Sequence, residues 1–426
     1  MPDDALPGRR LRTSRRGLLT LGGAALASGA AVTGGVLAGC DDSPATPRAH
    51  DRVPFYGAHQ AGIATPAQAR LAFAGYDLTV NGTVEQNRAA LKLLLTTWTR
   101  AAAAMTEGKS VPGDNDNPAA PPADTGEAYG APPANLTITF GVGPSLFDGR
   151  FGLAPRRPAA LADLPRLPPE NLDPERSNGD LVIQACSDDP LVAFHAIRNL
   201  ARLGRGTVVM RWSQLGFGKA TSNGEDQETP RNLMGFKDGT RNVDGRDASL
   251  MDGHVWVGAE SDQDWMRGGS YLVARRIRMR IEAWDRDVLD DQQKVIGRFK
   301  YSGAPLTGKA EHDVPDYAAK GPDGEPAMPV DSHVRLASHE NNGGIRILRR
   351  GYSFTDGIIP AQGELDAGLF FVAYQKDPRK QFVPLQRSLG AHDALNEYIQ
   401  HVGSGLFACP PGVAAAGGHW AKRLLD

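Results

Sequence analysis

The stretch DLVIQACSDDPLVAFHAIRNLARLGRGTVVMRW, residues 180–212, decides the fold class. Asp180–Cys186 and Thr207–Trp212 are short runs rich in apolar and β-branched residues, which favour strands. Pro190–Leu203, between them, predicts a helix. A strand, a helix and a second strand in close succession are typical of an α+β domain.

The residues before this stretch extend the same pattern. Residues 107–134 are rich in Gly, Pro, Asp and Asn and predict a long surface loop, and Leu136–Phe140 (LTITF) predicts a strand. We expect helices over Ala67–Ala74 and Glu85–Met105. The second helix is supported by apolar residues at a spacing near 3.6, namely Leu91, Leu94, Leu95, Trp98 and Ala102.

The residues after it repeat the mixture of strand and helix. The polar residues 218–231 predict a connection between two halves. Beyond them, Ser270–Ile281 alternates strongly and predicts a strand, and Leu369–Tyr374 predicts another. We expect helices over Trp284–Ile296 and His392–Gln400. Two α+β halves of similar size fit a chain of 426 residues.

Composition excludes several function classes. The hydrophobic content of 41% and the charged content of 23% are those of an ordinary globular protein. A net charge of −2 gives no basic field for nucleic acid. Three cysteines are too few for a disulfide framework, and ten histidines without an HExxH pattern do not favour zinc. Neither Cys186 nor Cys409 is assigned a role.

The N-terminal residues 1–40 form a targeting segment rather than part of the fold. Five arginines precede a mild apolar run over Leu18–Gly39, and the residues SRRGLL at 14–19 resemble a twin-arginine export signal. The run is too weakly hydrophobic to predict a permanent membrane span. Because this route carries folded proteins, the signal also hints at a cofactor acquired before export.

The end of this segment predicts a lipid anchor. Residues 37–40, LAGC, resemble a lipoprotein cleavage box, after which Cys40 would carry the lipid. Residues 41–53 would then be a linker that tethers a soluble domain to the outer face of the cell membrane. Ordinary cleavage without a lipid is the alternative. Both predict an extracytoplasmic protein that is periplasmic, secreted or lipid-anchored.

Three later segments carry the candidate chemistry. In residues 235–242, GFKDGTRN, two glycines bracket an acidic side chain and let the backbone approach a flat ligand. A surface turn is the alternative, because Asp-Gly is a common turn pair. Residues 331–339, DSHVRLASH, place a histidine in a polar loop, and residues 347–354, ILRRGYSF, contain two arginines. Taken alone, each of these would be an ordinary surface segment.

Together and in this order, the segments resemble the dye-decolourising peroxidase family. Gly235, Asp238 and Gly239 match its GxxDG motif, His333 its His-x-Arg haem-ligand segment, and Arg349 its distal arginine at the start of LRRG. Further matches lie along nearly the whole mature chain, at residues 54–63, 136–141, 211–217, 268–273, 297–298, 303–306 and 395–399.

One segment departs from the family pattern. After the haem-ligand histidine the family often continues Asn-Pro-Arg, whereas this chain has Ser338, His339 and Glu340. His339 is therefore a second histidine near the ligand. We prefer His333 because it has the family's His-x-Arg context.

The resemblance implies both a fold and a cofactor. We expect two ferredoxin-like halves with antiparallel sheets and peripheral helices, residues 54–222 and 223–426, and one haem b per chain held mainly by the second half. His333 would be the iron ligand. Asp238 would move a proton between the peroxide oxygens, and Arg349 would stabilise charge on the leaving oxygen.

The resemblance also suggests supporting roles. Asp393 is the expected carboxylate behind His333. Phe371 is expected to line the distal pocket. The remaining expected cofactor contacts, some of them donors to the haem propionates, are Gly239, Thr240, Asn242 and Arg276. Packing or surface roles are the alternative for Thr240, Asn242, Arg276 and Phe371.

Three functions fit these features. The first is a peroxidase that uses hydrogen peroxide to oxidise phenolic or dye-like donors, with a surface Tyr or Trp as a relay for large dyes. The second is a deferrochelatase/peroxidase of iron uptake, suggested by the export signal and the opening residues 55–63, FYGAHQAGI. The third is a lipid-tethered haem carrier, which needs neither Asp238 nor Arg349. A homo-oligomer is left open.

Overall fold

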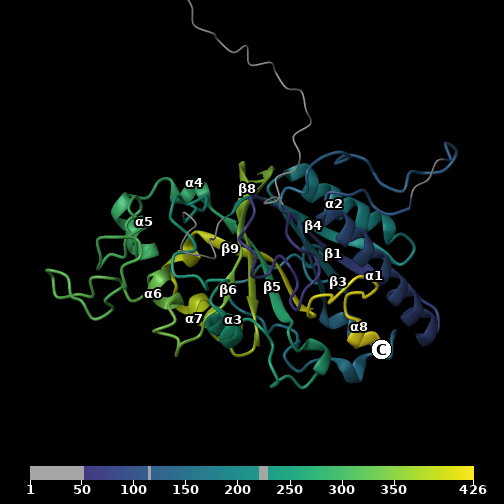
Figure 1. The fold of residues 1–426 in the computed structure, drawn as a ribbon. Helices are drawn as coiled ribbons and strands as arrows, with labels where there is room; N and C mark the ends of the chain where they lie inside the picture. The colour runs from purple at the N-terminus through teal and green to yellow at the C-terminus, as the bar shows by residue number, and fades with distance from the viewer. Residues whose placement is uncertain (1–51, 114–116, 220–228) are drawn as a thin grey trace, which may run out of the picture. The chain divides into compact units, whose positions relative to one another are not determined.

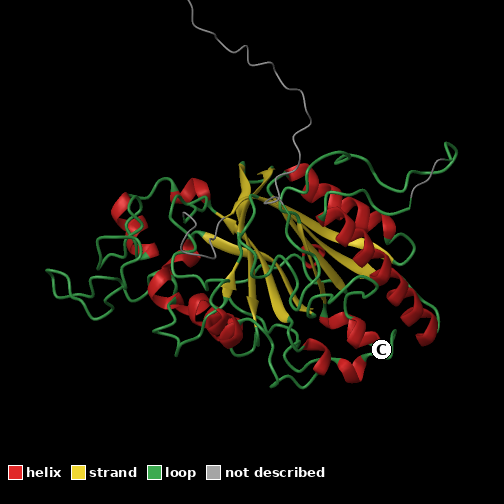
Figure 2. Ribbon diagram, viewed as in Figure 1, coloured by secondary structure: helices red, strands yellow, loops and turns green. Residues whose placement is uncertain are grey.

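Strands and helices alternate from Arg70 onward in the computed structural model, which describes residues 52–113, 117–219 and 229–426 (Figures 1 and 2). The predicted export signal, the lipidation site Cys40 and the predicted boundary between residues 222 and 223 lie outside the described residues. Residues 47–426 belong to one compact unit, so the word half refers below only to the order of strands and helices.

The first half is a βαββαβ unit. Its strands lie in the order β4-β1-β3-β2, all antiparallel, which is the order of a ferredoxin-like fold. The elements are β1 (Arg70–Leu78), α1 (Val84–Thr106), β2 (Thr137–Val142), β3 (Leu181–Ser187), α2 (Pro190–Leu203) and β4 (Val208–Lys219).

The second half repeats this order as β7-β8-β5-β9, so the predicted fold class is confirmed. A two-residue strand, β6 (Leu348–Arg349), pairs with β8 just before β7 begins. The elements are α3 (Ala248–His254), β5 (Ser270–Met279), α4 (Ile281–Trp284), α5 (Leu289–Ile296), α6 (His333–Ala337), β7 (Tyr352–Ile359), β8 (Glu364–Gln375), α7 (Phe382–His392), β9 (Ile399–Cys409) and α8 (Lys422–Leu425).

The two sheets join into a closed ring. β2 meets β9 where Val142 pairs with Ala408, and β4 meets β7 where Phe217 pairs with Ser353. Because side chains alternate along a strand, each strand has an inner and an outer face. Most of the inner face is a buried apolar cluster, which includes Leu71, Phe73, Cys186, Leu272, Leu348, Phe370, Val372, Tyr374 and Phe407.

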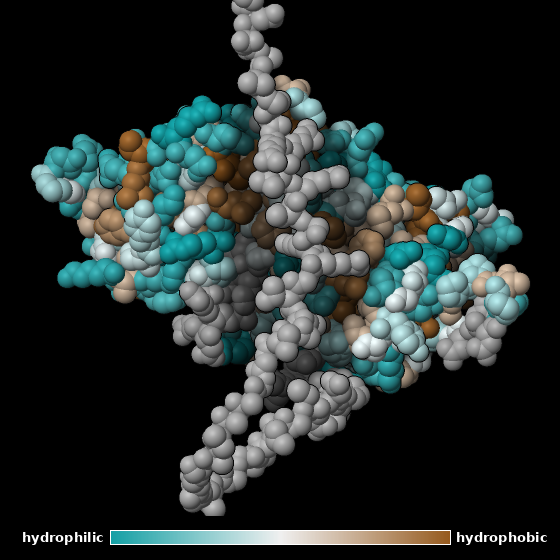
Figure 3. All heavy atoms as spheres, turned by 90° about the horizontal axis from the view of Figure 1, so that it is seen from above, coloured by the Kyte–Doolittle hydropathy of each residue, from teal (hydrophilic) through white to brown (hydrophobic). Residues whose placement is uncertain are grey.

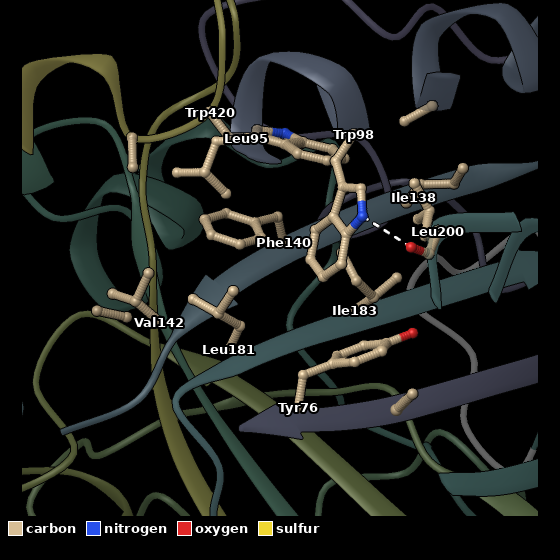
Figure 4. Close-up of a cluster of buried hydrophobic side chains, with 14 of the residues drawn as sticks. Tyr76, Leu95, Trp98, Ile138, Phe140, Val142, Leu181, Ile183, Leu200 and Trp420 are labelled. Carbon is tan, nitrogen blue, oxygen red and sulfur yellow. Dashed lines mark hydrogen bonds between the residues drawn. The ribbon is translucent and has the colours of Figure 1, made fainter. Parts of the chain in front are cut away.

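The outer face of the first half is covered by α1 and α2 (Figure 1). Trp98 of α1 is fully buried, and its Nε1 donates a hydrogen bond of 2.8 Å to the carbonyl of Leu200 in α2 (Figure 4). Thr83 and Gln86 form a capping box that starts α1. The bond from Trp98 fixes the two helices against each other over the sheet.

The outer face of the second half positions the candidate site. Arg349 pairs with Ala373 across β6 and β8, and Arg275 pairs with Phe371 across β5 and β8. Residues that pair directly share a face, as do residues two apart on one strand. Arg349, Phe371 and Arg275 therefore share the outer face, on the side of the sheet where Figure 1 shows α4 to α7.

Most predicted elements are confirmed, but one is wrong. The helix expected over Ala67–Ala74 is instead largely strand β1. Leu71 and Phe73 of β1 face the inside of the ring, while Ala72, Ala74 and Tyr76 face the outer core. A strand buried on both faces shows no alternation, so its sequence gives no period of two.

Two further elements differ in extent. The helix expected over Trp284–Ile296 is shorter in the structure: α4 ends at Trp284, and α5 begins at Leu289. Nε2 of Gln292 donates to the carbonyl of Trp284 at 2.8 Å and caps the end of α4. The helix expected over His392–Gln400 is only a short 3₁₀ turn, Ala394–Glu397, before β9 begins.

The surface shown in Figure 3 is mainly hydrophilic, with the apolar side chains in small groups. None of the helices within the described residues is long and apolar enough to cross a membrane.

Candidate active site

His333 and Asp393 form a hydrogen-bonded pair. His333 is the first residue of α6, and Asp393 precedes the 3₁₀ turn, where its Oδ1 accepts a hydrogen bond of 2.9 Å from the amide of Leu395. The other carboxylate oxygen, Oδ2, accepts from Nδ1 of His333 at 2.6 Å. A carboxylate held at Nδ1 orients the ring and leaves Nε2 as the ligating nitrogen.

The His333 side chain is partly exposed, and its pKa is raised. Its side chain is 34% exposed, against 2% for Asp393. Burial alone would lower the pKa of His333, but the charge of Asp393 and its hydrogen bond outweigh burial and raise it. No hydrogen bond within the described residues engages Nε2, although neighbouring atoms desolvate the ring. This nitrogen is therefore open to an iron ion.

Asp238 and Arg349 form a second pair. Gly235 and Gly239 both have positive φ, at 83° and 109°, so the loop that presents Asp238 turns where a residue with a Cβ would be strained. Asn242 holds the backbone of Arg349 from both sides, because its Nδ2 donates to the carbonyl at 2.8 Å and its Oδ1 accepts from the amide at 2.9 Å. Arg349 then donates to Oδ1 of Asp238 at 2.6 Å.

The Asp238–Arg349 pair influences His333 electrostatically. The charge of Asp238 contributes to raising the pKa of His333, and the charge of Arg349 opposes it. Phe371 shares the outer sheet face with Arg349 and is partly exposed. The structure thus brings together His333, Asp393, Asp238 and Arg349, which come from segments far apart in the sequence.

Further arginines fit a doubly anionic cofactor. Burial lowers the pKa of Arg298 to about 10, and the like charges of Arg241 and Arg349 contribute. The pKa of Arg346 is lowered by burial and by Arg241. Arg241 also has a left-handed backbone, with φ at 64°, a strained conformation of the kind that gathers at functional sites. The two propionates of haem would relieve this mutual repulsion, so the site fits haem.

Arg241, Arg298 and Arg346 were not predicted as site residues from the sequence. Arg241 and Arg298 stand inside the segments that matched the family, but nothing in their spacing shows that they meet. Glu340, where the family often has arginine, forms an ion pair with Arg241. Arg241, from the loop that carries Asp238, therefore supplies a cation next to position 340, where the family often has its own arginine.

The other predicted contacts are distributed differently. Thr240 donates to Glu311 at 3.0 Å, and the Asn242 amide is engaged by the Arg349 backbone, so both support the loop and strand that carry the site. The structure does not bring Arg276 to the site. It pairs with Phe370, which faces the inside of the ring, and it donates to Asp356 at 2.8 Å. Its predicted role in haem binding stays a prediction.

His339 is engaged at both ring nitrogens. Nε2 accepts from Arg346 at 2.6 Å, and Nδ1 lies 3.1 Å from the Glu340 carboxylate. This geometry leaves no nitrogen open for iron and favours His333 as the ligand.

A histidine with an open Nε2, an aspartate–arginine pair and a cluster of arginines define the site of a haem peroxidase. The chain belongs to the Dyp-type peroxidase family: the N-terminal family model matches residues 60–218 and the C-terminal model residues 229–414.

Individual relatives agree with this assignment. The chain is 40% identical over 382 residues to the deferrochelatase of Escherichia coli (strain K12), which covers 88% of each protein. Ferric DtpA from Streptomyces lividans matches with a TM-score of 0.79 and 40% identity, over 88% of this chain and 97% of that one. A DyP-type peroxidase from Streptomyces coelicolor matches with a TM-score of 0.80 and 41% identity, over 88% and 97%.

The protein is therefore an enzyme, a haem peroxidase, and hydrogen peroxide and a reductant are its substrates. The haem-carrier alternative is set aside.

Proposed function

We propose that the protein reduces hydrogen peroxide through Asp238 and Arg349, with His333 as the iron ligand, and oxidises small organic donors outside the cytoplasm. The observation that carries this proposal is the 2.6 Å ion pair between Asp238 and Arg349, whose charges act on His333. Haem, when bound, supplies the iron at which peroxide is reduced and through which the donor is oxidised.

His333 would hold the iron through Nε2. The Asp393 carboxylate is 2% exposed and accepts the Nδ1 proton, so it increases the electron density on the ring and prevents its rotation. The backbone bond from the amide of Ala394 to the carbonyl of Asp331, at 3.0 Å, ties the two segments together. Both members of the pair are thus fixed before the iron arrives.

Asp238 is the group placed to move a proton. Reduction of hydrogen peroxide requires a proton to pass from the oxygen near the acceptor to the departing oxygen. A carboxylate does this when it lies within hydrogen-bond reach, directly or through a water. Asp238 is only 14% exposed, and its amide donates to the carbonyl of Pro230 at 2.9 Å, so the carboxylate is held in place.

Arg349 would stabilise the negative charge that develops on the departing oxygen. A guanidinium stays charged at any working pH and presents several donors in a fixed plane. Because Asn242 clamps the Arg349 backbone, the side chain starts from a defined position and needs little reorganisation.

A stopped-flow measurement of the haem absorption band after mixing with hydrogen peroxide tests these roles. We expect Asp238→Asn and Arg349→Leu to keep haem and to react with peroxide about 10²–10⁴-fold and about 10²–10³-fold more slowly, respectively. Asp244→Asn is the matched control, because Asp244 also pairs with an arginine, Arg246, at 2.8 Å in the same region. A wild-type rate in either site variant removes that residue from its proposed role.

The deferrochelatase named among the relatives supports a second candidate, an iron-releasing role in iron uptake. The predicted export signal and the predicted lipid on Cys40 support an extracytoplasmic location for either function, with a membrane tether. Incubation of the pure protein with haem and an iron(II) chelator distinguishes the two. Release of iron from an intact porphyrin favours the second candidate, and its absence together with peroxide-dependent donor oxidation favours the first.

A further inference from the structure

A cavity of about 470 Å³ lies at the seam between the two halves. One wall is the loop over residues 163–172 of the first half, and the other is formed by β5 and β9 of the second half. The wall is apolar where Leu164, Leu172 and Leu406 line it, while Glu170 and Arg275 line it with charge. Cavities of this size and mixed lining, at a junction between structural units, are typical of small-molecule sites.

The charged floor of the cavity is a buried network. Arg275 is 1% exposed at its side chain, and its NH2 donates to Oε1 of Glu170 at 2.5 Å. Its NH1 donates to Oγ of Ser404 at 2.8 Å. The second oxygen of Glu170 accepts from the amide of Leu167 at 2.9 Å. The Glu170 carboxylate is thereby fixed, and because each of its oxygens accepts one of these bonds, it retains capacity to accept another.

Stability alone does not account for this network. A buried ion pair is often no more stabilising than well-packed apolar residues of the same volume. Next to the pair, His401 is also buried, and burial together with the charge of Arg275 lowers its pKa to about 3. His401 stays neutral and is held by Arg275 at Nδ1 and by Gln386 at Nε2, so among the groups of this network that line the cavity the Glu170 carboxylate is the one that can accept a hydrogen bond or a proton from a ligand.

The cavity adjoins the sheet face that carries the active site. Arg275 pairs with Phe371 across β5 and β8, and Phe371 shares that face with Arg349. The Arg275 guanidinium also lies over the ring of Phe382, 5.8 Å from its centroid, and that ring is 6.3 Å from the ring of Phe371. A chain of neighbouring side chains, Arg275, Phe382 and Phe371, therefore connects the cavity to the face that carries the site.

We propose that this cavity binds the phenolic donor of the peroxidase. This inference rests on the proposed oxidation of organic donors. The aromatic ring would pack against Leu164, Leu172 and Leu406, and the hydroxyl would donate to Glu170. When the phenol gives up one electron, its hydroxyl proton passes to Glu170. Two phenols lose two electrons and two protons in all, one hydrogen peroxide takes them up, and the products are two phenoxyl radicals and two waters.

The experiment uses the haem-loaded protein and 2-methoxyphenol as the probe. Leu172→Trp fills the cavity from its rim, and the fold tolerates this change because Leu172 is 37% exposed. Leu191→Trp is the matched control, since Leu191 is 47% exposed on α2 and lines no part of the cavity. Equilibrium dialysis measures binding of the phenol. Steady-state kinetics measure its oxidation and that of a bulky sulfonated anthraquinone dye.

We expect Leu172→Trp to weaken phenol binding and raise its KM by about tenfold, equivalent to about 1.4 kcal/mol, with kcat for the phenol and both constants for the dye unchanged. Leu191→Trp should match the wild type. Unchanged binding and KM in Leu172→Trp overturn the proposal, as does an equal loss with phenol and dye. If the wild type binds the phenol but oxidises neither donor with peroxide, the proposed function itself fails and the cavity is no donor site.

Discussion

Substitution of Asp393 by asparagine isolates one interaction at the haem-binding side of the site. Asparagine keeps the size of the side chain and the oxygen that accepts from the Leu395 amide at 2.9 Å. It is also as good as aspartate at the start of a helical turn. What it removes is the negative charge 2.6 Å from Nδ1 of His333.

The expected loss can be estimated in two ways. A hydrogen bond to a charged group contributes about 1.5–3 kcal/mol when it is buried, and Asp393 is 2% exposed. Loss of the group that orients a metal-bound histidine typically lowers metal affinity or activity by about 10–100-fold, or about 1.4–2.8 kcal/mol. The two estimates agree, so we expect Asp393→Asn to bind haem about 10–100-fold more weakly.

Titration of the haem-free protein with haem, followed by absorption, gives this affinity. The iron–histidine stretching frequency of the reduced protein, measured by resonance Raman, reports the electron density on the ring and should fall. Asp189→Asn is the control, because Asp189 caps α2 through the amides of Leu191 and Val192 and contacts no site residue. Wild-type haem affinity together with an unchanged stretching frequency in Asp393→Asn would refute the reasoning.

Three further predictions concern the framework around the site. Arg276→Gln should leave haem affinity unchanged, because Arg276 faces the inside of the ring. It should lower the free energy of unfolding by about 1.5–3 kcal/mol, because Asp366 loses its ion-pair partner while Asp356 keeps Arg176. Weaker haem binding at wild-type stability would contradict this. Hydrogen bonds from Arg150 and the Leu78 amide outweigh burial and lower the pKa of Asp180, so its contribution to stability is present above pH about 4 and is lost as the pH falls through the lower folded pKa. The difference in unfolding free energy between the wild type and Asp180→Asn should therefore shrink below pH about 4 in denaturant titrations, and a constant difference contradicts the assignment. Trp98→Phe should cost about 0.5–1.5 kcal/mol in thermal unfolding from the lost hydrogen bond, because the buried carbonyl of Leu200 loses one of its two donors and keeps the Gly204 amide, and it should leave the peroxide reaction unchanged.

The sequence predicted the regular elements best where one face of an element is exposed. Pro190–Leu203 was expected as a helix and α2 has the same bounds. Its apolar face packs on the sheet and its polar face meets water, so its pattern is clear. Strand β1 was mistaken for a helix because both of its faces are buried, one inside the ring and one under α1 and α2. The ring is closed by the pairings of β2 with β9 and of β4 with β7, which join residues far apart in the sequence and cannot be predicted from a local pattern.

The site shows the same limit. The order of the motifs predicted His333, Asp238 and Arg349, and the structure places them and Asp393 in two hydrogen-bonded pairs. Arg276 was expected among the haem contacts from the family resemblance alone. Both faces of this strand are buried, so only the register shows that Arg275 and Arg276 point to opposite sides.

The most direct test of the account is the absorption spectrum of His333→Gly, purified with haem supplied, before and after addition of imidazole. The wild type and His339→Gln are measured beside it. We predict that His333→Gly lacks the histidine-ligated spectrum and regains it when imidazole occupies the vacated position, and that His339→Gln resembles the wild type. A wild-type spectrum in His333→Gly without imidazole would contradict the account and place the iron ligand elsewhere.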